Sequence, residues 1–207
     1  MTNGYEQTYE RIVPRLQTCN FPAAAETLGF TLVSKDRLSI DFLGRPYLIT
    51  KEGVCPADGG AVDINILSVL VYYTISQGAG ALLYDFCLLH HFSHGLFTHR
   101  APGVNWQTEP LRKEFAPSYP HFVDTVTELG LVYEGSRVPG AYIWNYRLLP
   151  KIPVKVIYYA GDDEFPCDIS IFYDKTAISF LDFEPLAVLN GCFVHVLASL
   201  GKARRGV

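Results

Sequence analysis

Residues 38–50 read LSIDFLGRPYLIT, and apolar and polar side chains alternate on both sides of the central Leu43-Gly44-Arg45-Pro46. Alternation with a period of two is typical of a strand that buries one face, and the central residues favour a turn. Later in the chain, turn residues separate three runs of β-branched and aromatic side chains: 141–147, 154–159 and 169–173. We therefore predict antiparallel strands in all of these segments.

Two apolar helices are predicted to flank these strands. Asp63 suits the N-cap of a helix over 63–77, because its carboxylate can accept hydrogen bonds from the free amides of the first turn. Pro185 suits the first turn of a second helix, over 185–200, which carries an apolar stripe at helical spacing. Each helix then has one face that must be buried against another element.

Length and composition indicate a globular chain. Of its 207 residues 49% are hydrophobic and 18% are charged, which is enough apolar material for a sizeable core. We expect a single α+β domain over 1–207, or at most two small interleaved domains. In this fold class, one mainly antiparallel sheet built from 38–50 and 141–173 is covered on one face by the helices over 63–77 and 185–200.

The rest of the chain is assigned from local signals, chiefly proline, glycine and helical spacing. Residues 1–30 are predicted to form N-terminal helices with breaks at Pro14 and Phe21-Pro22, and 51–60 a loop. A helix over 82–94 is ended by Gly95, and two more follow over 109–115 and 121–129, the second with Gly130 as its C-cap. Residues 202–207 are predicted to be a flexible basic tail.

Charge and cysteine content exclude several classes of protein. The formal net charge is −4 and there is no basic stripe, so we expect no nucleic-acid binding. Five scattered cysteines form no CxxC pair, which excludes the usual local spacing of an iron–sulfur cluster or a zinc ribbon. With free thiols and no signal-peptide pattern at the N-terminus, we expect a cytoplasmic protein.

Residues 64–84 carry no charge and match the length of about 20 residues that a membrane-spanning helix needs. The segment also contains polar side chains, and Gln77-Gly78-Ala79-Gly80 is typical of the end of a helix. No cluster of Lys or Arg flanks it. We therefore predict a buried helix that ends near Gln77, and no membrane partner.

Several segments together resemble the family catalogued as domain of unknown function 3786 (DUF3786), found largely in anaerobic bacteria and archaea. They are IDFLGRPY over 40–47, INILSVLVYY over 64–73, LPKIPVKVIYYAGDDEFP over 149–166, IFYD over 171–174 and LAVL over 186–189. The resemblance covers most of the chain, except for the histidine-rich residues 82–100. It implies no reaction. Some members are fused to a four-cysteine iron–sulfur domain of the corrinoid-protein kind, which implies a setting in anaerobic one-carbon or corrinoid metabolism; this chain lacks that domain.

The densest set of candidate ligands lies in the predicted helix over 82–94. On a helix, Cys87, His90, His91 and His94 would share an arc of about 100°, because each residue turns the helix by about 100°. Thiolate and imidazole bind transition metals, and either can be an axial ligand of a tetrapyrrole metal. We predict a metal site at Cys87, His91 and His94, with His90 as the alternative ligand. The competing interpretation is a chance cluster with Cys87 in the core.

Two weaker constellations are also present. Asp162-Asp163-Glu164 could hold Mg²⁺ or Ca²⁺ through carboxylate oxygens, although acidic turns between strands are usually only solvated. Cys192 and His195 lie three residues apart on the last predicted helix and could form a nucleophile and base, but packing is the simpler role for both. His195, among Val194, Val196 and Leu197, is expected to be a partly buried core residue.

No phosphate-binding loop, dinucleotide fingerprint or serine-nucleophile motif occurs. Three functions remain open. The first is a cytoplasmic binding or accessory protein that holds a transition metal or a tetrapyrrole or corrinoid cofactor for a partner enzyme of anaerobic one-carbon or corrinoid metabolism. The others are a small enzyme with histidine and carboxylate acid–base groups in a cleft between sheet and helices, and an interaction module without a ligand.

Overall fold

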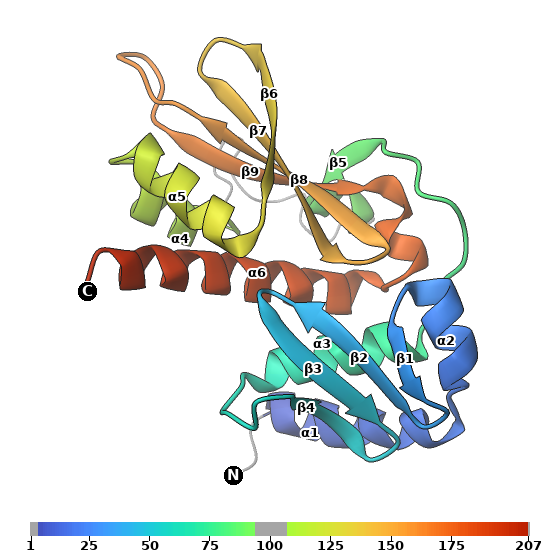
Figure 1. The fold of residues 1–207 in the computed structure, drawn as a ribbon. Coiled ribbons are helices and arrows are strands. Elements are labelled where there is room, and N and C mark those ends of the chain that lie inside the picture. Colours follow the sequence, from blue (N-terminus) through green and yellow to red (C-terminus); the bar gives the residue numbers. More distant parts are fainter. Residues whose placement is uncertain (1–3, 94–106, 207) are drawn as a thin grey trace. The chain divides into compact units, whose positions relative to one another are not determined.

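The computed structural model describes residues 4–93 and 107–206 (Figure 1). The chain divides into two compact units, each assembled from separate stretches of sequence. Unit 1 comprises 1–82, 149–152 and 176–189, and unit 2 comprises 83–148, 153–175 and 190–207. A single helix contributes residues to both units, and the single-domain expectation stays a prediction.

Unit 1 contains a four-stranded antiparallel sheet with the strand order β1-β2-β3-β4. Its strands are β1 (Thr31–Ser34), β2 (Arg37–Phe42), β3 (Arg45–Thr50) and β4 (Gly53–Pro56). Phe42 pairs with Arg45 across the β2–β3 turn, so Leu43 and Gly44 are the two turn residues. Both have positive φ (52° and 78°), which suits the twist of a tight hairpin. This confirms the hairpin predicted over 38–50.

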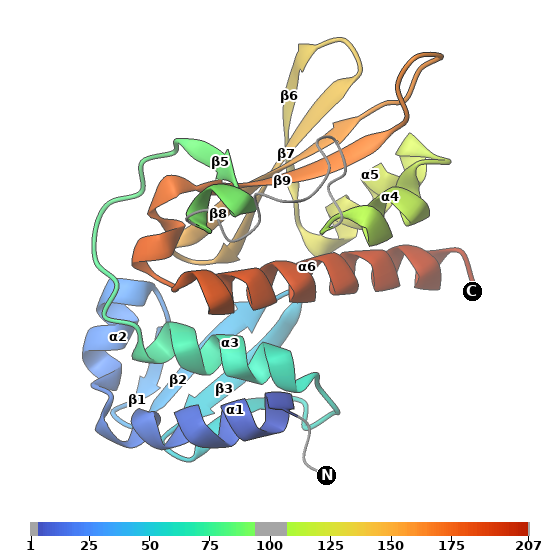
Figure 2. The ribbon, with the colours of Figure 1, turned by 180° about the vertical axis from the view of Figure 1, so that it is seen from behind.

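The helices of unit 1 are α1 (Gly4–Ile12), the 3₁₀ helix η1 (Val13–Thr18), α2 (Phe21–Leu28) and α3 (Ile64–Ile75). Asp63 caps α3 as predicted, since its side chain accepts a hydrogen bond from Asn65 N at 2.9 Å. Figure 2 shows α1 and α3 running side by side across the four-stranded sheet. The fully buried Tyr73 fastens α3, because its hydroxyl donates to Leu28 O (2.7 Å) and accepts from Lys151 N (3.1 Å).

Unit 2 contains a five-stranded sheet with the order β5-β9-β8-β7-β6. Its strands are β5 (Phe86–Leu88), β6 (Val132–Val138), β7 (Ala141–Leu149), β8 (Ile152–Tyr159) and β9 (Asp168–Asp174). The other elements of this half of the sequence are the 3₁₀ helices η2 (Leu89–Phe92) and η3 (Lys175–Ser179), and the helices α4 (Glu109–Phe115), α5 (Tyr119–Leu129) and α6 (Phe183–Arg204).

One face of the five-stranded sheet packs on helices. The ring of Tyr146 on β7 stacks on Phe193 of α6 with centroids 5.7 Å apart, and the Tyr173 hydroxyl on β9 donates to Asn190 Oδ1 at 2.9 Å. Phe122 of α5 contacts Trp144 and Tyr158 on the same face. Because side chains alternate along a strand, the neighbours of these residues point to the opposite face.

The α+β class and the antiparallel pairing are confirmed. The single sheet is wrong, because 38–50 and 141–173 lie in different sheets among the described residues. Alternation shows which face of a strand is buried but not which strand is its neighbour. The 51–60 loop contains β4, and β1 and β6 were not predicted; β1 is exposed at all four positions, so burial leaves no pattern to detect there.

The helix predicted over 82–94 is also wrong as far as the structure describes it. β5 and η2 occupy Phe86–Phe92, because the backbone of β5 pairs with β9, about 85 residues away in sequence. No local pattern reveals such a partner. At the C-terminus, the tail expected from 202 is still helical to Arg204, whose guanidinium pairs with the Glu128 carboxylate of α5.

Membrane insertion of 64–84 is not supported, because α3 has only 12 residues. Within the described part of the chain, α6 is long and apolar enough to span a membrane, and 50% of its most apolar window is buried. The core helix of a soluble domain meets the same criterion, so the composition of α6 is weak evidence for a membrane.

Candidate functional site

The predicted ligands near position 90 do not lie on a helical stripe. Cys87 is half-buried on β5 opposite Tyr173, and His90 and His91 follow in η2. Their two rings stack, with centroids 4.3 Å apart and planes at 28°, and His91 Nδ1 lies 3.2 Å from Leu88 O. His94 lies outside the described residues.

Burial disfavours the charged form of these side chains. It raises the pKa of Cys87, against the charge of Lys175, so the thiolate that a metal requires is disfavoured. Burial, together with the charge of His91, lowers the pKa of His90. Within 4–93 and 107–206 no three His, Cys, Asp or Glu side chains gather as a metal site would require. The site at Cys87, His91 and His94 therefore stays a prediction.

The two weaker constellations have structural explanations. Asp162 Oδ1 accepts hydrogen bonds from the amides of Glu164 (2.9 Å) and Phe165 (2.7 Å), which lower its pKa and shape the turn. Cys192 is buried whereas His195 is exposed, so the expectation of a partly buried core histidine is wrong. Position 195 lies on the outer side of α6, where its apolar neighbours in sequence do not surround it.

A cavity of about 330 Å³ in unit 2 is a better candidate, and we call it the sheet pocket. The side chains that give it chemical character come from four strands and the segment before β5: Tyr84, Phe86, Glu134, Asn145, Arg147 and Lys155. Its volume is near the lower end of the range for small-molecule sites, about 300–1,000 Å³.

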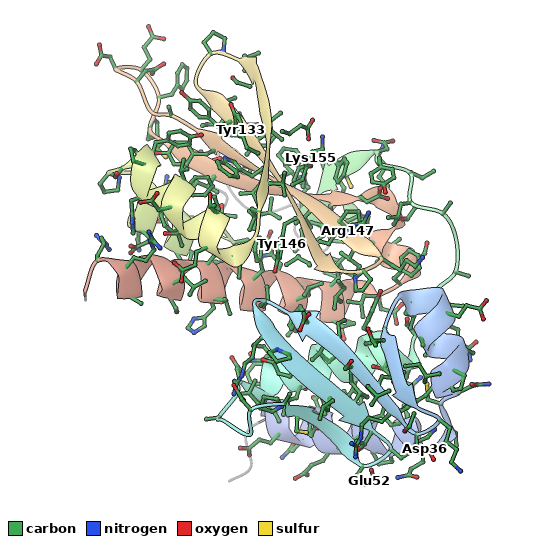
Figure 3. The ribbon with its side chains drawn as sticks, in the orientation of Figure 1. Asp36, Glu52, Tyr133, Tyr146, Arg147 and Lys155 are labelled. Carbon is green, nitrogen blue, oxygen red and sulfur yellow. The ribbon has the colours of Figure 1, made fainter. Side chains whose placement is uncertain are left out.

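Strand register explains why these side chains meet. Tyr146 faces α6, so Asn145 and Arg147 on either side of it point to the opposite face of the sheet. Val154 on β8 lies opposite Tyr173, another residue that faces α6, and its neighbour Lys155 therefore also points to the opposite face. Figure 3 labels Tyr146, Arg147 and Lys155 on these two neighbouring strands.

Lys155 is held firmly in place. Its ammonium lies 2.5 and 2.8 Å from the two carboxylate oxygens of Glu134 on β6, and 5.1 Å from the centroid of the Phe86 ring on β5. The two charged side chains are only 20% and 28% exposed, which reduces screening by water. Ion pair and cation–π contact together fix the ammonium above the sheet.

Tyr84 has a strained backbone, with φ of +53° in a region that tyrosine rarely adopts. Its amide donates a hydrogen bond to the fully buried carboxylate of Asp174 on β9. Next to it, the backbone of Lys175 donates to Asp85 O at 2.8 Å, and the two side chains form an ion pair at 2.7 Å. These contacts hold Tyr84 where its hydroxyl can accept a hydrogen bond from Arg147, at 3.5 Å.

The sheet pocket thus combines a guanidinium, an ammonium, a carboxylate, a carboxamide and a phenol. Such groups recognise polar and charged ligands. Sequence reasoning missed this site because its members come from separate strands, and only their register brings them together. One signal was available. Lys155 lies between the apolar residues Val154 and Val156, so if these two face the core, the alternation of a strand puts Lys155 on the opposite face.

A family model described as "Domain of unknown function (DUF3786)" matches residues 20–196 of this chain. The match spans well over half of the sequence and confirms the resemblance found in the motifs. Comparison with curated proteins and with solved structures gives no match. The chain belongs to the DUF3786 family.

Proposed function

We propose that this chain is a binding protein whose sheet pocket holds a small ligand with an acidic group, a carboxylate or a phosphate. One observation carries the proposal: Arg147 and Lys155 extend from neighbouring strands over the same face of the sheet, beside Asn145 and the Tyr84 hydroxyl. A guanidinium matches the two oxygens of a carboxylate or phosphate in a bidentate pair, and an adjacent ammonium adds a point charge.

Preorganisation supports a binding role. Tyr84 is kept in its strained conformation by a buried carboxylate, and Lys155 by Glu134 and Phe86. Strained backbone of this kind is found mainly at functional sites, where the surrounding structure maintains it. Side chains that are already fixed lose little further entropy when a ligand binds, which favours affinity.

The lining is less suited to catalysis. Among the described residues, the lining of the sheet pocket includes no Cys, Ser, Thr or His, and so no thiol or aliphatic hydroxyl nucleophile with an adjacent histidine. The Lys155 side chain is held in an ion pair with the Glu134 carboxylate, so its nitrogen is not free to approach a substrate as a nucleophile. These features support the binding or accessory protein over the enzyme with histidine and carboxylate groups.

A volume of 330 Å³ accommodates a small molecule, or the acidic arm of a larger one. The carboxylate arms of a tetrapyrrole belong to this chemical class, which relates the pocket to the cofactor expected from the sequence. That cofactor, the transition metal, the partner enzyme and the cytoplasmic location remain predictions. An absorbance spectrum and elemental analysis of protein purified without oxygen would test for the metal and the macrocycle.

The binding proposal is tested by titrating the full chain with citrate, pyrophosphate and haemin while recording amide NMR spectra. We expect saturable shifts at 145–147 and 153–155 with at least one of these anions. Arg147→Gln should weaken this binding about tenfold or more, and Arg147→Lys should restore part of it. Arg11→Gln is the matched control, because Arg11 is exposed on α1 and lines none of the cavities described here. Equal loss in both variants, or no saturable binding, would contradict the proposal.

A further inference from the structure

A second pair of cavities lies in unit 1, around the C-terminal end of α3, and we call it the α3-end groove. The two cavities measure 480 and 320 Å³. They share five lining residues and therefore adjoin: Arg15, Ile75, Ser76, Gln77 and Gly78. The larger cavity is completed by η1 and α2, and Figure 2 shows α2 beside the end of α3.

The groove exists because the chain leaves the helix abruptly. Ser76 adopts an extended conformation (φ −65°, ψ 141°) directly after α3. Gly78 then lies so close to the backbone of 179–180 that a Cβ atom would be 2.5 Å from Ser179 O. Only glycine permits this approach. The segment is thereby held against 179–180, and the space between it and α2 stays open.

The charge of the larger cavity is unusual for an acidic chain. Of the residues that the structure describes, no Asp or Glu lines the larger cavity, and Asp182 is the only carboxylate in the smaller one. Arg15 is exposed at the shared wall, and it makes no ion pair with any residue in the described part of the chain. An unpaired guanidinium without a competing carboxylate attracts an anion.

A second cation lies close by. The ammonium of Lys51 contacts the carbonyl oxygens of Leu16 (3.2 Å), Gln17 (3.5 Å) and Cys19 (2.5 Å). Burial raises the pKa of the Cys19 thiol, and the positive charge of Lys51 partly opposes this effect. Cys19 lines the larger cavity, so the Lys51 ammonium places a positive charge close to that cavity.

Ser76 contributes a hydrogen-bonding group that the folded chain leaves unused. It lines both cavities, and its Oγ is buried without a hydrogen-bond partner among the described residues. A buried hydroxyl without a partner is unfavourable unless something else supplies the hydrogen bond. The α2 N-terminus does not supply the anion contacts, because Asn20 Oδ1 already accepts from Ala23 N at 3.2 Å and Pro22 has no amide hydrogen.

We infer that the α3-end groove is a second binding site, for an oxyanion of the phosphate or carboxylate class, held by the Arg15 guanidinium and the Ser76 hydroxyl. The site is separate from the sheet pocket and does not rest on the function proposed for it. The Cys19 thiol stays protonated near neutral pH because burial dominates its pKa, so the groove binds its ligand without covalent chemistry.

The test uses the full chain and two probes, pyrophosphate for the phosphate source and citrate for the carboxylate source, with glucose as the neutral comparison. We expect saturable amide shifts at 18–24 and 76–79 with one or both anions and none with glucose. Arg15→Gln should weaken this binding about tenfold, whereas Arg11→Gln, which makes the same charge change one turn earlier, should change it less than about twofold. Equal weakening by both variants would show a general charge effect and overturn the site.

Ser76→Ala separates binding from structure. Because the hydroxyl lacks a partner in the free protein, its removal should leave the melting temperature unchanged or slightly higher. The affinity for the anion should nevertheless fall severalfold. Retained affinity in Ser76→Ala, whether or not the melting temperature falls, would show that Ser76 serves the fold and not a ligand. Shifts at 76–79 that survive in Arg147→Gln would establish that the groove acts independently of the sheet pocket.

Discussion

The sheet pocket and the α3-end groove both present an arginine to a cavity, but they treat the neighbouring charges differently. In the sheet pocket the second cation, Lys155, is paired with Glu134 and packed against Phe86. In the groove Arg15 has no acidic partner in the described residues, and the second cation, Lys51, is occupied by backbone carbonyls. A paired cation is fixed in place but partly neutralised, whereas an unpaired one attracts anions more strongly and is less ordered.

The difference suggests two kinds of recognition. A ligand of the sheet pocket must complement fixed charges of both signs, which favours selectivity. A ligand of the groove meets a positive potential with few geometric demands, so its binding should be more sensitive to salt. Three predictions test this contrast, from the largest expected effect to the smallest.

The largest effect is expected at Asp174, whose fully buried carboxylate holds the strained Tyr84 beside the sheet pocket. Asp174→Ala leaves the Tyr84 amide without this partner and removes a charged hydrogen bond from the core. The free energy of unfolding should fall by about 3 kcal/mol. Denaturant unfolding measures this, and Asp85→Ala is the control.

Asp85 lies next to the same segment but is 57% exposed in its ion pair with Lys175, so its loss should cost less than about 0.5 kcal/mol. Similar losses in the two variants would mean that Tyr84 is not held by the buried carboxylate. The sheet pocket would then lack the rigidity that distinguishes it from the groove.

A smaller effect is expected when the sheet pocket is made to resemble the groove. Glu134→Gln removes the partner of Lys155 and leaves its ammonium available to an anionic ligand. Unfolding should become easier by about 0.5 kcal/mol, because the pair is partly exposed. The affinity for citrate or pyrophosphate should rise severalfold and become more dependent on salt. Calorimetry at two ionic strengths measures both, and a fall in affinity would show that Glu134 itself contacts the ligand.

The sequence predicted local features of the fold better than the neighbours of each strand. The hairpin over 38–50, the Asp63 cap and the Gly130 C-cap depend on a few adjacent residues, and the structure has all three. β5 could not be predicted in this way, because its three residues are ordered by pairing with β9. A short segment with ambiguous periodicity takes its conformation from a distant partner.

The same limit applies to the two cavities. Alternation is a signal that puts Lys155 on the polar face of its strand, and the predictions from the sequence did not include it. Its contacts with Glu134 and Phe86 depend on the strand order β5-β9-β8-β7-β6, which alternation does not reveal. Gln77-Gly78-Ala79-Gly80 was correctly identified as following a helix, yet its approach to 179–180 has no local signal. Contacts of this kind join residues that are far apart in the sequence, so they can be identified only once the fold is known.

The smallest effect concerns two cysteines: Cys19, which lines the groove, and Cys87 on β5, which lines neither the groove nor the sheet pocket. Burial raises the pKa of both thiols, so near neutral pH each is mostly protonated and each reacts slowly with iodoacetamide, faster as the pH increases. An oxyanion bound in the groove adds a negative charge beside Cys19, which raises its pKa further and also shields the sulfur. Pyrophosphate should therefore slow the alkylation of Cys19 by about two- to threefold while leaving Cys87 unaffected.

Mass spectrometry of the modified peptides, with and without the anion, measures the two rates in one sample. Equal slowing at both cysteines would mean that the anion acts through the bulk solution, and the contrast between the two regions would then lose its electrostatic basis.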